Sequence, residues 1–550
     1  MWATIVIGAF TDLDGLAPIH CPTRGPAPVT DPAQAAAAIA AGYDFSSVAL
    51  ELGSVSVDGQ VSSDAKVRIP LSMMNRHGLV AGATGTGKTK TLQLIAEQLS
   101  ANGVPVVMAD IKGDLSGLSN PGVSNDRITA RAEQTADQWA PTAYPVEFVS
   151  LGSSGIGVPI RATITSFGPI LLAKVLGLND TQESVLGLIF HWADKQGLAL
   201  LDLKDLRSVI AYLTSDEGKP ELKAIGGVSP QTAGVILRAL TNLEAEGGDT
   251  FFGEPEIEPA DLLRLTADGR GIVTLFELGA QAARPALFST FLMWILADLF
   301  EFLPEVGDLD KPKLVFIFDE SHLLFADASK AFKEQVVQTV KLIRSKGVGV
   351  FFCSQLPTDI PNEVLSQLGA RIQHALRAFT PDDQKALART VKTYPVSEVY
   401  ELDKALTSLG TGEAVVTVLS EKGAPTPVAW TVIRAPRSSM EAVGAEGITA
   451  AAKASPLYAK YGQSIDRESA YEKLAAKALA PGESPDAPAP APKPAPAPKA
   501  ESRAKAPAEE PGMITEVLTS KPVQSFLRSA ATAAGREFSR AIFGTGRRRR

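Results

Sequence analysis

Residues 77–115 read HGLVAGATGTGKTKTLQLIAEQLSANGVPVVMADIKGDL, and this stretch decides the fold class. A short apolar run at 78–81 leads into a glycine-rich segment, an amphipathic stretch and a second apolar run at 104–109. The order strand, loop, helix, strand predicts a βαβ unit. Because a βαβ unit places its two strands parallel, the stretch also predicts a parallel sheet.

The glycine-rich segment GATGTGKT (82–89) matches the phosphate-binding pattern G-x-x-x-x-G-K-[ST]. Its glycines let the backbone N–H groups face phosphate oxygens, and Lys88 is expected to reach the β- and γ-phosphates. The Thr89 hydroxyl is expected to bind Mg²⁺, so ATP and Mg²⁺ are the predicted cofactors. A chance glycine-rich turn is the alternative, which the flanking strand and helix disfavour. The residues predicted to contact the nucleotide are Gly82, Ala83, Thr84, Gly85, Thr86, Gly87, Lys88, Thr89, Lys90 and Asp110.

A second signal is LVFIFDE (314–320), an unbroken apolar run that ends in two carboxylates. Asp319, at the tip of a strand beside the phosphate loop, is predicted to hold Mg²⁺. Glu320 is then placed to orient and deprotonate an attacking water. The alternative is an acidic helix N-cap, since DESHLLF could open a helix. Together with the phosphate loop, the pair favours ATP hydrolysis.

Asp110, Lys112 and Asp114 follow the strand next to the phosphate loop. Ligands of open α/β sheets bind at the carboxyl ends of the strands, so these residues are expected to border the pocket. For Asp114 an equal alternative is that it caps the following helix.

Further apolar runs alternate with helical patterns along the chain. This alternation predicts an α/β protein with a mainly parallel sheet and helices on both faces, interrupted by a mostly helical segment at 165–265. Strands are expected at 271–278, 313–320 and 348–355, and helices at 284–303 and 329–347.

The composition limits the partners and the compartment. The chain of 550 residues has a formal net charge of −8, yet residues 513–550 carry about +6, so the remainder is about −14. That is no bulk electrostatic footprint for nucleic acid, although a local basic channel stays open. Two cysteines, Cys21 and Cys353, cannot form a disulfide framework, which favours a cytoplasmic location. No apolar run is long enough to span a bilayer, and residues 1–15 are interpreted as a first strand and not a signal peptide.

Several separated motifs carry a family resemblance. The phosphate loop, DESHLLF (319–325) and RSKGVGVFFCSQLP (344–357) resemble the HerA–FtsK superfamily of ring-forming P-loop ATPases. ADIKGDLSGLS (109–119) and the hairpin pattern at 412–440 resemble one branch of it, the bacterial HerA-like proteins of the YjgR type. The resemblance covers about residues 45–475.

The resemblance implies a RecA-like core and a hexamer with the nucleotide between subunits. Arg344 matches the arginine that members insert into the neighbouring site, the trans finger, and Gln355 matches their polar sensor. Arg371 matches a second arginine near the neighbouring site. Without the resemblance, Arg344 is interpreted as a solvated cation that the helix dipole favours at a helix end.

The sequence divides into six predicted units. They are an N-terminal β-rich, barrel-like domain (1–72), a RecA-like ATPase core (73–164 and 266–440), a helical insertion (165–265), a helical extension (441–480), a disordered Pro/Ala linker (481–512) and an amphipathic basic tail (513–550).

Two functions from different classes fit these observations. The leading one is an oligomeric Mg²⁺-dependent ATPase that acts as a motor on DNA, and its DNA part rests on the resemblance. The other is an ATP-gated scaffold or switch that acts on a protein partner. A small-molecule kinase fits poorly, because such enzymes are usually shorter and lack a large helical insertion.

Overall fold

The computed structural model describes residues 31–224, 226–279, 284–326 and 328–479. Their strands form one 12-stranded sheet in the order β2-β1-β12-β11-β10-β3-β9-β8-β4-β7-β5-β6. The strands from β10 to β6 in this order are parallel to one another, and the remaining pairs are antiparallel. The predicted α/β class with a mainly parallel sheet is confirmed.

The strands have the following bounds: β1 (Ala49–Val57), β2 (Gln60–Pro70), β3 (Gly78–Ala81), β4 (Val106–Asp110), β5 (Val146–Leu151), β6 (Val158–Ile160), β7 (Val273–Glu277), β8 (Leu314–Phe318), β9 (Val348–Ser354), β10 (Ala370–Gln373), β11 (Glu413–Thr417) and β12 (Ala429–Ile433).

The helices have the following bounds: α1 (Pro32–Ala41), α2 (Lys88–Ala101), α3 (Asp126–Gln134), α4 (Ile164–Val175), α5 (Asp180–Lys195), α6 (Leu203–Thr214), α7 (Lys219–Ala224), α8 (Pro230–Ala245), α9 (Pro285–Phe302), α10 (His322–Phe325), α11 (Lys330–Ile343), α12 (Asn362–Leu365), α13 (Pro381–Val391), α14 (Leu402–Ser408), α15 (Ala445–Ala454), α16 (Pro456–Tyr461) and α17 (Ala470–Leu479).

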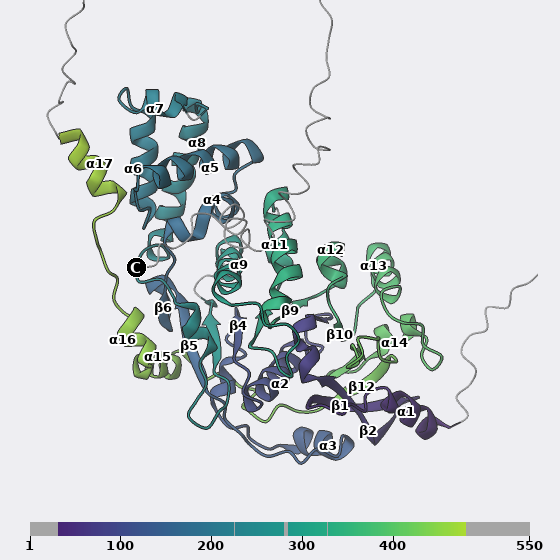
Figure 1. Cartoon of the computed structure of the whole chain (residues 1–550). Coiled ribbons are helices and arrows are strands. Elements are labelled where there is room, and N and C mark those ends of the chain that lie inside the picture. The colour runs from purple at the N-terminus through teal and green to yellow at the C-terminus, as the bar shows by residue number, and fades with distance from the viewer. Residues whose placement is uncertain (1–30, 225, 280–283, 327, 480–550) are drawn as a thin grey trace, which may run out of the picture.

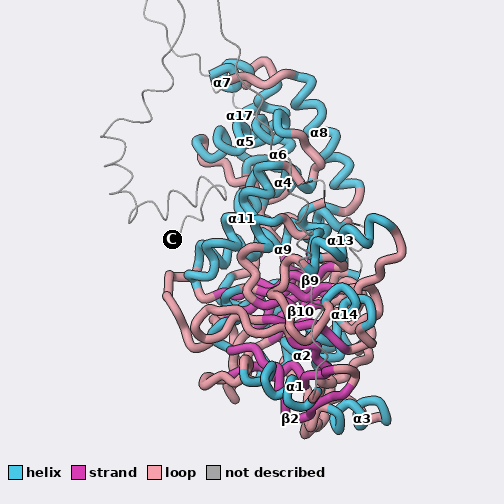
Figure 2. The backbone as a smooth tube through the Cα atoms, turned by 90° about the vertical axis from the view of Figure 1, so that its right-hand side faces the viewer, coloured by secondary structure: helices cyan, strands magenta, loops and turns pink. Residues whose placement is uncertain are grey.

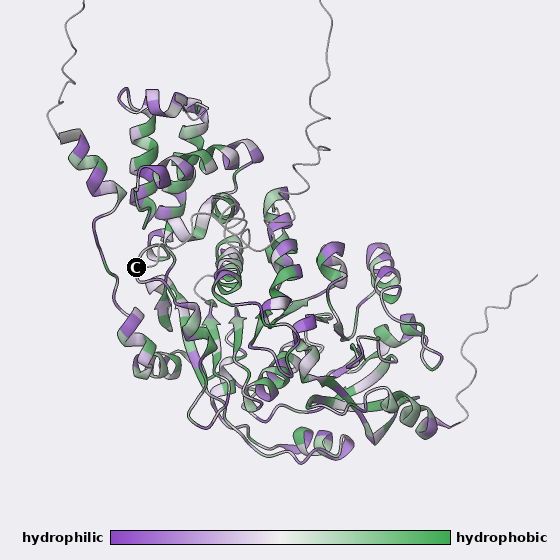
Figure 3. Cartoon of the chain, viewed as in Figure 1, coloured by the Kyte–Doolittle hydropathy of each residue, from purple (hydrophilic) through white to green (hydrophobic). Residues whose placement is uncertain are grey.

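Both faces of the parallel part of the sheet are buried. Along β4, Val107 and Ala109 belong to one hydrophobic cluster, whereas Val106 and Met108 belong to a second cluster on the opposite face. Side chains alternate between faces along a strand, so an unbroken apolar run is what a doubly covered strand requires. Figure 3 shows the same concentration of hydrophobic residues on the central strands.

The N-terminal hairpin belongs to this same sheet. β1 pairs with β2 and, on its other side, with β12, where Gly53 lies opposite Ile433. The pairing gives β1 a partner strand on each side and leaves β2 at the edge of the sheet. Residues 49–70 thus extend the core sheet and do not stand apart from it, so the predicted boundary at residue 72 lies within a continuous sheet. The division into domains stays a prediction.

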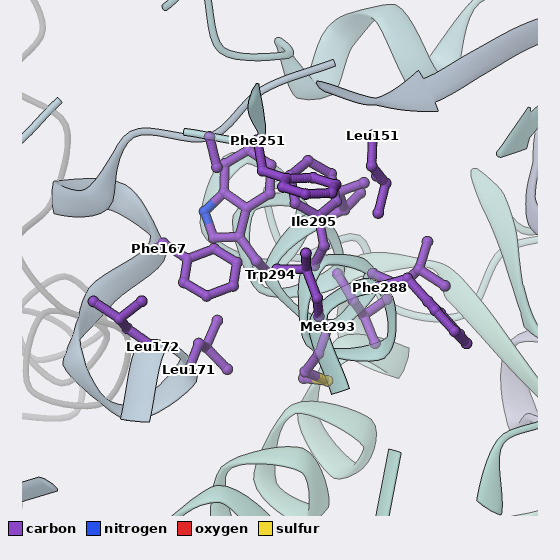
Figure 4. Packing of buried hydrophobic residues seen from close by; sticks show 14 of the residues in the cluster. Leu151, Phe167, Leu171, Leu172, Phe251, Phe288, Met293, Trp294 and Ile295 are labelled. Carbon is purple, nitrogen blue, oxygen red and sulfur yellow. The ribbon is translucent and has the colours of Figure 1, made fainter. Parts of the chain in front are cut away.

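The segment between β6 and β7 forms a helical lobe, which we define as α4 to α8. It stands above the sheet in Figures 1 and 2. Its base is joined to the core by aromatic packing, in which Phe167 of α4 lies 5.3 Å from Phe252 and 6.5 Å from Trp294 of α9, as centroid distances. Figure 4 shows Phe167, Leu171 and Phe251 gathered around Trp294. One hydrophobic cluster therefore includes the lobe and one face of the sheet.

The predicted helical extension contains α15, α16 and α17. α15 packs beside β5, α16 beside β6 and α17 against α6 of the lobe, and the three helices lie along one side of the molecule in Figure 1. The predicted first strand (1–15), linker and basic tail lie outside the described residues. Within the described ranges, no helix has the length and apolar character needed to cross a membrane.

Candidate functional site

The phosphate loop lies between β3 and α2, as predicted. Gly82, Gly85 and Gly87 have φ values of 150°, 80° and 114°, a region that residues with a Cβ rarely adopt. A Cβ on Gly82 would lie 2.6 Å from His374 Cβ, so a side chain has no room there. The N-cap residue of α2 is Gly87, which has no side chain to bond the first N–H groups, so these groups and the helix dipole favour an anion at the loop.

Three neighbouring segments hold the loop. Gly82 N donates to Ser354 O at the end of β9 (3.2 Å), and Ala83 N donates to Ala375 O after β10 (2.8 Å). Gly412 N donates to Thr86 O (3.0 Å) just before β11. The loop conformation is therefore supported by backbone hydrogen bonds from both strands beside β3 and from the start of β11.

Lys88 and Lys90 have different surroundings. Lys88 Nζ donates to the carbonyl oxygens of Gly82 (2.6 Å) and Ala83 (3.1 Å), so it lies against the loop itself. Lys90 Nζ instead donates to Met440 O (2.9 Å) and Asp114 O (3.3 Å), which ties α2 to two outer segments. Lys88 is thus placed to meet a phosphate, whereas Lys90 is held away from the loop by its carbonyl partners.

Asp319 follows β8, two strands from β3, and is the predicted magnesium ligand. Its Oδ1 accepts from Glu320 N (2.9 Å), and it is hydrogen bonded to the Cys353 thiol of β9. Burial and the charge of Glu320 raise the pKa of Asp319. In the capping alternative, the carboxylate would cap α10; instead the N-cap residue of α10 is Ser321, whose hydroxyl donates to Cys353 O (2.8 Å) and does not cap the helix.

Glu320 shows features of a reactive carboxylate. Its backbone has φ 47°, a strained conformation for a residue with a long side chain. Its side chain is 18% exposed, with Oε1 3.5 Å from Lys112 Nζ and Oε2 3.4 Å from His322 Nδ1. Oε2 is buried and accepts no hydrogen bond among the described residues. An acceptor in this state can bind and orient a water molecule.

Asp110 organises the loop after β4. It is buried and accepts from the backbone N–H groups of Lys112 (3.2 Å), Asp114 (3.1 Å) and Leu115 (2.8 Å). Asp114 does not cap the next helix, because the turn Ser116–Ser119 has Leu115 as its N-cap. Asp110 therefore fixes the segment that carries Lys112 toward Glu320.

Glu277 was not predicted as part of the site. It ends β7 in register with Asp110, its Oε1 is buried and accepts no hydrogen bond among the described residues, and burial followed by the charge of Asp110 raises its pKa to about 7. The signal in the sequence is a glutamate at the end of the apolar run 272–276, but only the sheet order places it beside Asp110.

Gln355 lies at the phosphate-loop edge, as predicted. It directly follows β9, whose last residue, Ser354, is in register with Ala81 at the end of β3. Its side chain is exposed, whereas the Ser354 hydroxyl is buried and donates to Asp359. Gln355 is therefore free to reach toward a nucleotide bound next to the loop.

The arginines lie at the opposite edge of the sheet from the phosphate loop, where the parallel strands begin. Arg344 is in the turn η7 (Arg344–Lys346) ahead of β9, its side chain is 40% exposed, and its Nη2 lies 3.8 Å from Asp308 Oδ1. Arg76, two residues ahead of the first residue of β3, also lies 3.8 Å from that oxygen, through its Nη2. Arg371, near the start of β10, donates to Thr393 O and to Leu365 O (3.4 Å).

These three arginines and Lys341 line one cavity of about 510 Å³, which we call the arginine cavity. Arg76 was not predicted, although its place ahead of β3 parallels that of Arg344 ahead of β9. The phosphate loop and the arginine cavity lie at opposite ends of β3 and β9. Seven residues of β9 at about 3.3 Å each separate the edges by about 20 Å. One chain therefore cannot bring its arginines to its own phosphate loop.

The residues present fit a magnesium nucleotide. The N-terminus of α2 and the glycine-rich loop suit phosphates, and Oε2 of Glu320, which accepts no hydrogen bond in the described part of the chain, suits a water. Together with Asp319 at the tip of a buried strand, they define a P-loop ATPase that uses ATP and Mg²⁺.

The sequence matches the family described as "Helicase HerA-like C-terminal" over residues 56–550. The chain therefore belongs to the HerA-like family.

Several relatives of the chain are named helicases. The chain is 36% identical over 393 residues to "Probable helicase MJECL08" of Methanocaldococcus jannaschii, covering 68% of each chain. It is 21% identical over 379 residues to "DNA double-strand break repair helicase HerA" of Sulfolobus acidocaldarius, covering 67% of this chain and 68% of the relative. Among solved structures, the plasmid coupling protein TrwB in complex with the non-hydrolysable ATP analogue ADPNP has a TM-score of 0.49 at 14% identity, covering 74% of this chain and 93% of TrwB.

Proposed function

We propose that this protein is a ring-type, Mg²⁺-dependent ATPase that hydrolyses ATP at subunit interfaces and works as a motor on DNA. The observation that carries the proposal is the position of the arginine cavity, at the sheet edge opposite the phosphate loop. An arginine contributes to catalysis only where it meets the γ-phosphate. We call the sheet edge with the arginine cavity the arginine edge and the sheet edge with the phosphate loop the loop edge. A second copy completes the site when its arginine edge stacks on the loop edge of the first copy. Repetition of this head-to-tail contact closes a ring.

Each residue has a role in this proposal. Lys88 binds the β- and γ-phosphates, Thr89 and Asp319 hold Mg²⁺, and Glu320 takes a proton from the attacking water. Gln355 reads the γ-phosphate or the water through its amide. From the next subunit, Arg344 neutralises the charge that develops on the γ-phosphate, and Arg76 and Arg371 share its cavity.

The trans arrangement is tested by mixing two inactive variants. Arg344→Ala is expected to lose about 10³-fold of the ATPase rate, and Lys88→Ala loses its own nucleotide site. In a random 1:1 mixture, about a quarter of the interfaces pair an intact loop with an intact arginine, so activity returns. Arg207→Ala, an arginine of the lobe paired with Glu244, is the matched control and keeps the wild-type rate. A mixture that stays inactive contradicts a shared site.

DNA as the substrate is supported by the names of the relatives, a probable helicase and a DNA repair helicase. The ATPase rate is therefore measured with and without duplex DNA at low salt, where phosphate contacts are strongest. We expect stimulation by DNA that disappears in Glu320→Gln, together with a loss of about 10²-fold or more in the basal rate. A protein that is not retained on DNA and whose ATPase rate is not stimulated by DNA at low salt would contradict the DNA part of the proposal.

A second candidate function is an ATP-gated scaffold for a protein partner. The observation that favours it is the helical lobe, which projects above the sheet from a base packed on α9 (Figure 1). The net charge of −8 is compatible with a protein partner. An ATPase rate that is indifferent to DNA but depends on a lobe-binding protein selects this function. Six subunits and a cytoplasmic location remain predictions.

A further inference from the structure

His77 follows Arg76 and precedes β3, and its inferred role rests on the proposed shared site. The imidazole is buried, and both of its nitrogens lie within hydrogen-bond distance of backbone groups. Nδ1 accepts from Val350 N (3.0 Å) in β9, and Nε2 lies 2.9 Å from Val340 O in α11. These two partners are on either side of the turn that carries Arg344.

The partners determine the protonation of the ring. Val350 N–H can only donate, so Nδ1 carries no proton, and Val340 O can only accept, so Nε2 donates its proton. Burial, opposed by the Val340 hydrogen bond and reinforced by the charges of Arg344 and Arg76, lowers the pKa of His77 to about 4. At neutral pH the imidazole is therefore uncharged and is hydrogen bonded to a backbone group through each of its nitrogens.

The backbone of the same dipeptide contacts a third element. Gly369 N donates to Arg76 O (2.9 Å) and Ala370 N donates to His77 O (3.1 Å), immediately ahead of Arg371. His77 has φ 60° and ψ 169°, a region that is almost restricted to glycine. A strained histidine where glycine would be relaxed indicates that the side chain is needed.

We propose that His77 is the positioning residue of the arginine cavity. Its ring joins α11 and β9 across the turn of Arg344, while its backbone and that of Arg76 hold the start of β10 near Arg371. Three segments that are distant in the sequence thereby present their arginines to the neighbouring subunit in one geometry. A core histidine that only fills space would need neither both ring hydrogen bonds nor the strained backbone.

The test separates positioning from folding. His77→Phe fills the volume and loses both hydrogen bonds. His77→Asn keeps an acceptor near the position of Nδ1, and asparagine tolerates positive φ better than phenylalanine does. Direct binding of an ATP analogue to the phosphate loop is expected to stay within about twofold of wild type, while kcat falls at least about tenfold in His77→Phe and less in His77→Asn. His191→Asn, an exposed histidine of α5, is the matched control and changes neither value.

A double variant and a mixture of two variants test whether His77 acts through the arginine cavity. If His77 acts through the arginines, His77→Asn combined with Arg344→Ala loses less of the rate than the product of the two single losses. A mixture of His77→Phe with Lys88→Ala recovers activity, because the Lys88 variant supplies an intact arginine edge; if His77→Phe does not fold, His77→Asn takes its place in the mixture.

The inference is overturned by an unchanged kcat in both His77 variants, or by a fully additive loss in the double variant. Recovery of the Arg344→Ala mixture without recovery of the His77 mixture also overturns it and leaves the shared site standing. No recovery in either mixture overturns the shared site and the role of His77 together.

Discussion

Glu277 and Asp110 are two carboxylates at the carboxyl ends of neighbouring strands. Asp110 receives three backbone N–H groups, which favour its charged form. Glu277 Oε1 receives no hydrogen bond among the described residues, so its charge is the less stabilised of the two. We infer that Glu277 takes up a proton in the folded protein at a pH where it is ionised in the unfolded chain.

This difference predicts a pH-dependent stability. The folded pKa of Glu277, about 7, is raised above the ordinary value of 4.5, so the folded state binds more protons between these values. Its contribution to stability is therefore present at low pH and is lost as the pH rises through 7. Glu277→Gln, which mimics the protonated form, is expected to be more stable than wild type at pH 8 and similar at pH 5. Urea unfolding at both pH values measures this, and a variant that is less stable at pH 8 contradicts it.

Among the site residues, the sequence predicted those that belong to a local motif. Lys88, Thr89, Asp319 and Glu320 belong to contiguous patterns, and the structure places them at one edge of the sheet. Arg76 and His77 carry no motif of their own. Their environment arises from contacts with residues 263 to 293 positions later in the chain, which residue order alone does not show.

The helices α15, α16 and α17 form a strap that joins the core to the helical lobe. Near the core, the buried Tyr461 hydroxyl donates to Asp261 Oδ2 (2.5 Å), and Arg467 pairs with Glu254. At the lobe, Asp205 accepts from the Ser469 hydroxyl (2.5 Å) and from Tyr471 N (2.9 Å). The strap therefore fixes the lobe to the sheet at both ends by polar contacts.

We predict that Asp205→Ala loosens the strap and the lobe together. Asp205 is fully buried and also accepts from Leu201 N (2.8 Å), so its removal leaves several buried donors without a partner. The expected cost is at least about 2 kcal/mol in the free energy of unfolding. Hydrogen exchange is expected to show lost protection in α6 and α17 at once. Glu468→Ala, at an exposed position just ahead of α17, is the control; exchange that rises in α6 alone would argue against a strap.

Local patterns predicted most elements of the core. The expected strands at 271–278, 313–320 and 348–355 are β7, β8 and β9, each slightly shorter, and the helices at 284–303 and 329–347 are α9 and α11. These runs are strongly apolar or amphipathic and end at polar residues. The extension of the sheet by β1 and β2 was not predicted, because it depends on pairing with β12, about 380 residues away.

For the molecule as a whole, the two edges of the sheet have opposite character. The loop edge carries Asp319, Glu320, Asp110 and Glu277 at strand ends, and the arginine edge carries Arg76, Lys341, Arg344 and Arg371 around one cavity. Such edges attract each other when copies stack head to tail, and a nucleotide adds negative charge to the loop edge. Assembly should therefore depend on the nucleotide.

The final prediction is that ATP drives this assembly through the arginine cavity. The particle mass, measured by sedimentation, is expected to be a multiple of 57.9 kDa and to increase or sharpen when Mg²⁺ and a non-hydrolysable ATP analogue are added. Arg76→Ala and Arg344→Ala should each weaken this response, because each removes one cation that, in the proposed ring, faces the phosphates across the interface. Arg270→Ala is the matched control, since Arg270 precedes β7 at the same edge but pairs with Asp268 outside the cavity. A particle that stays at 57.9 kDa with the analogue, at concentrations where the enzyme is active, contradicts the shared site.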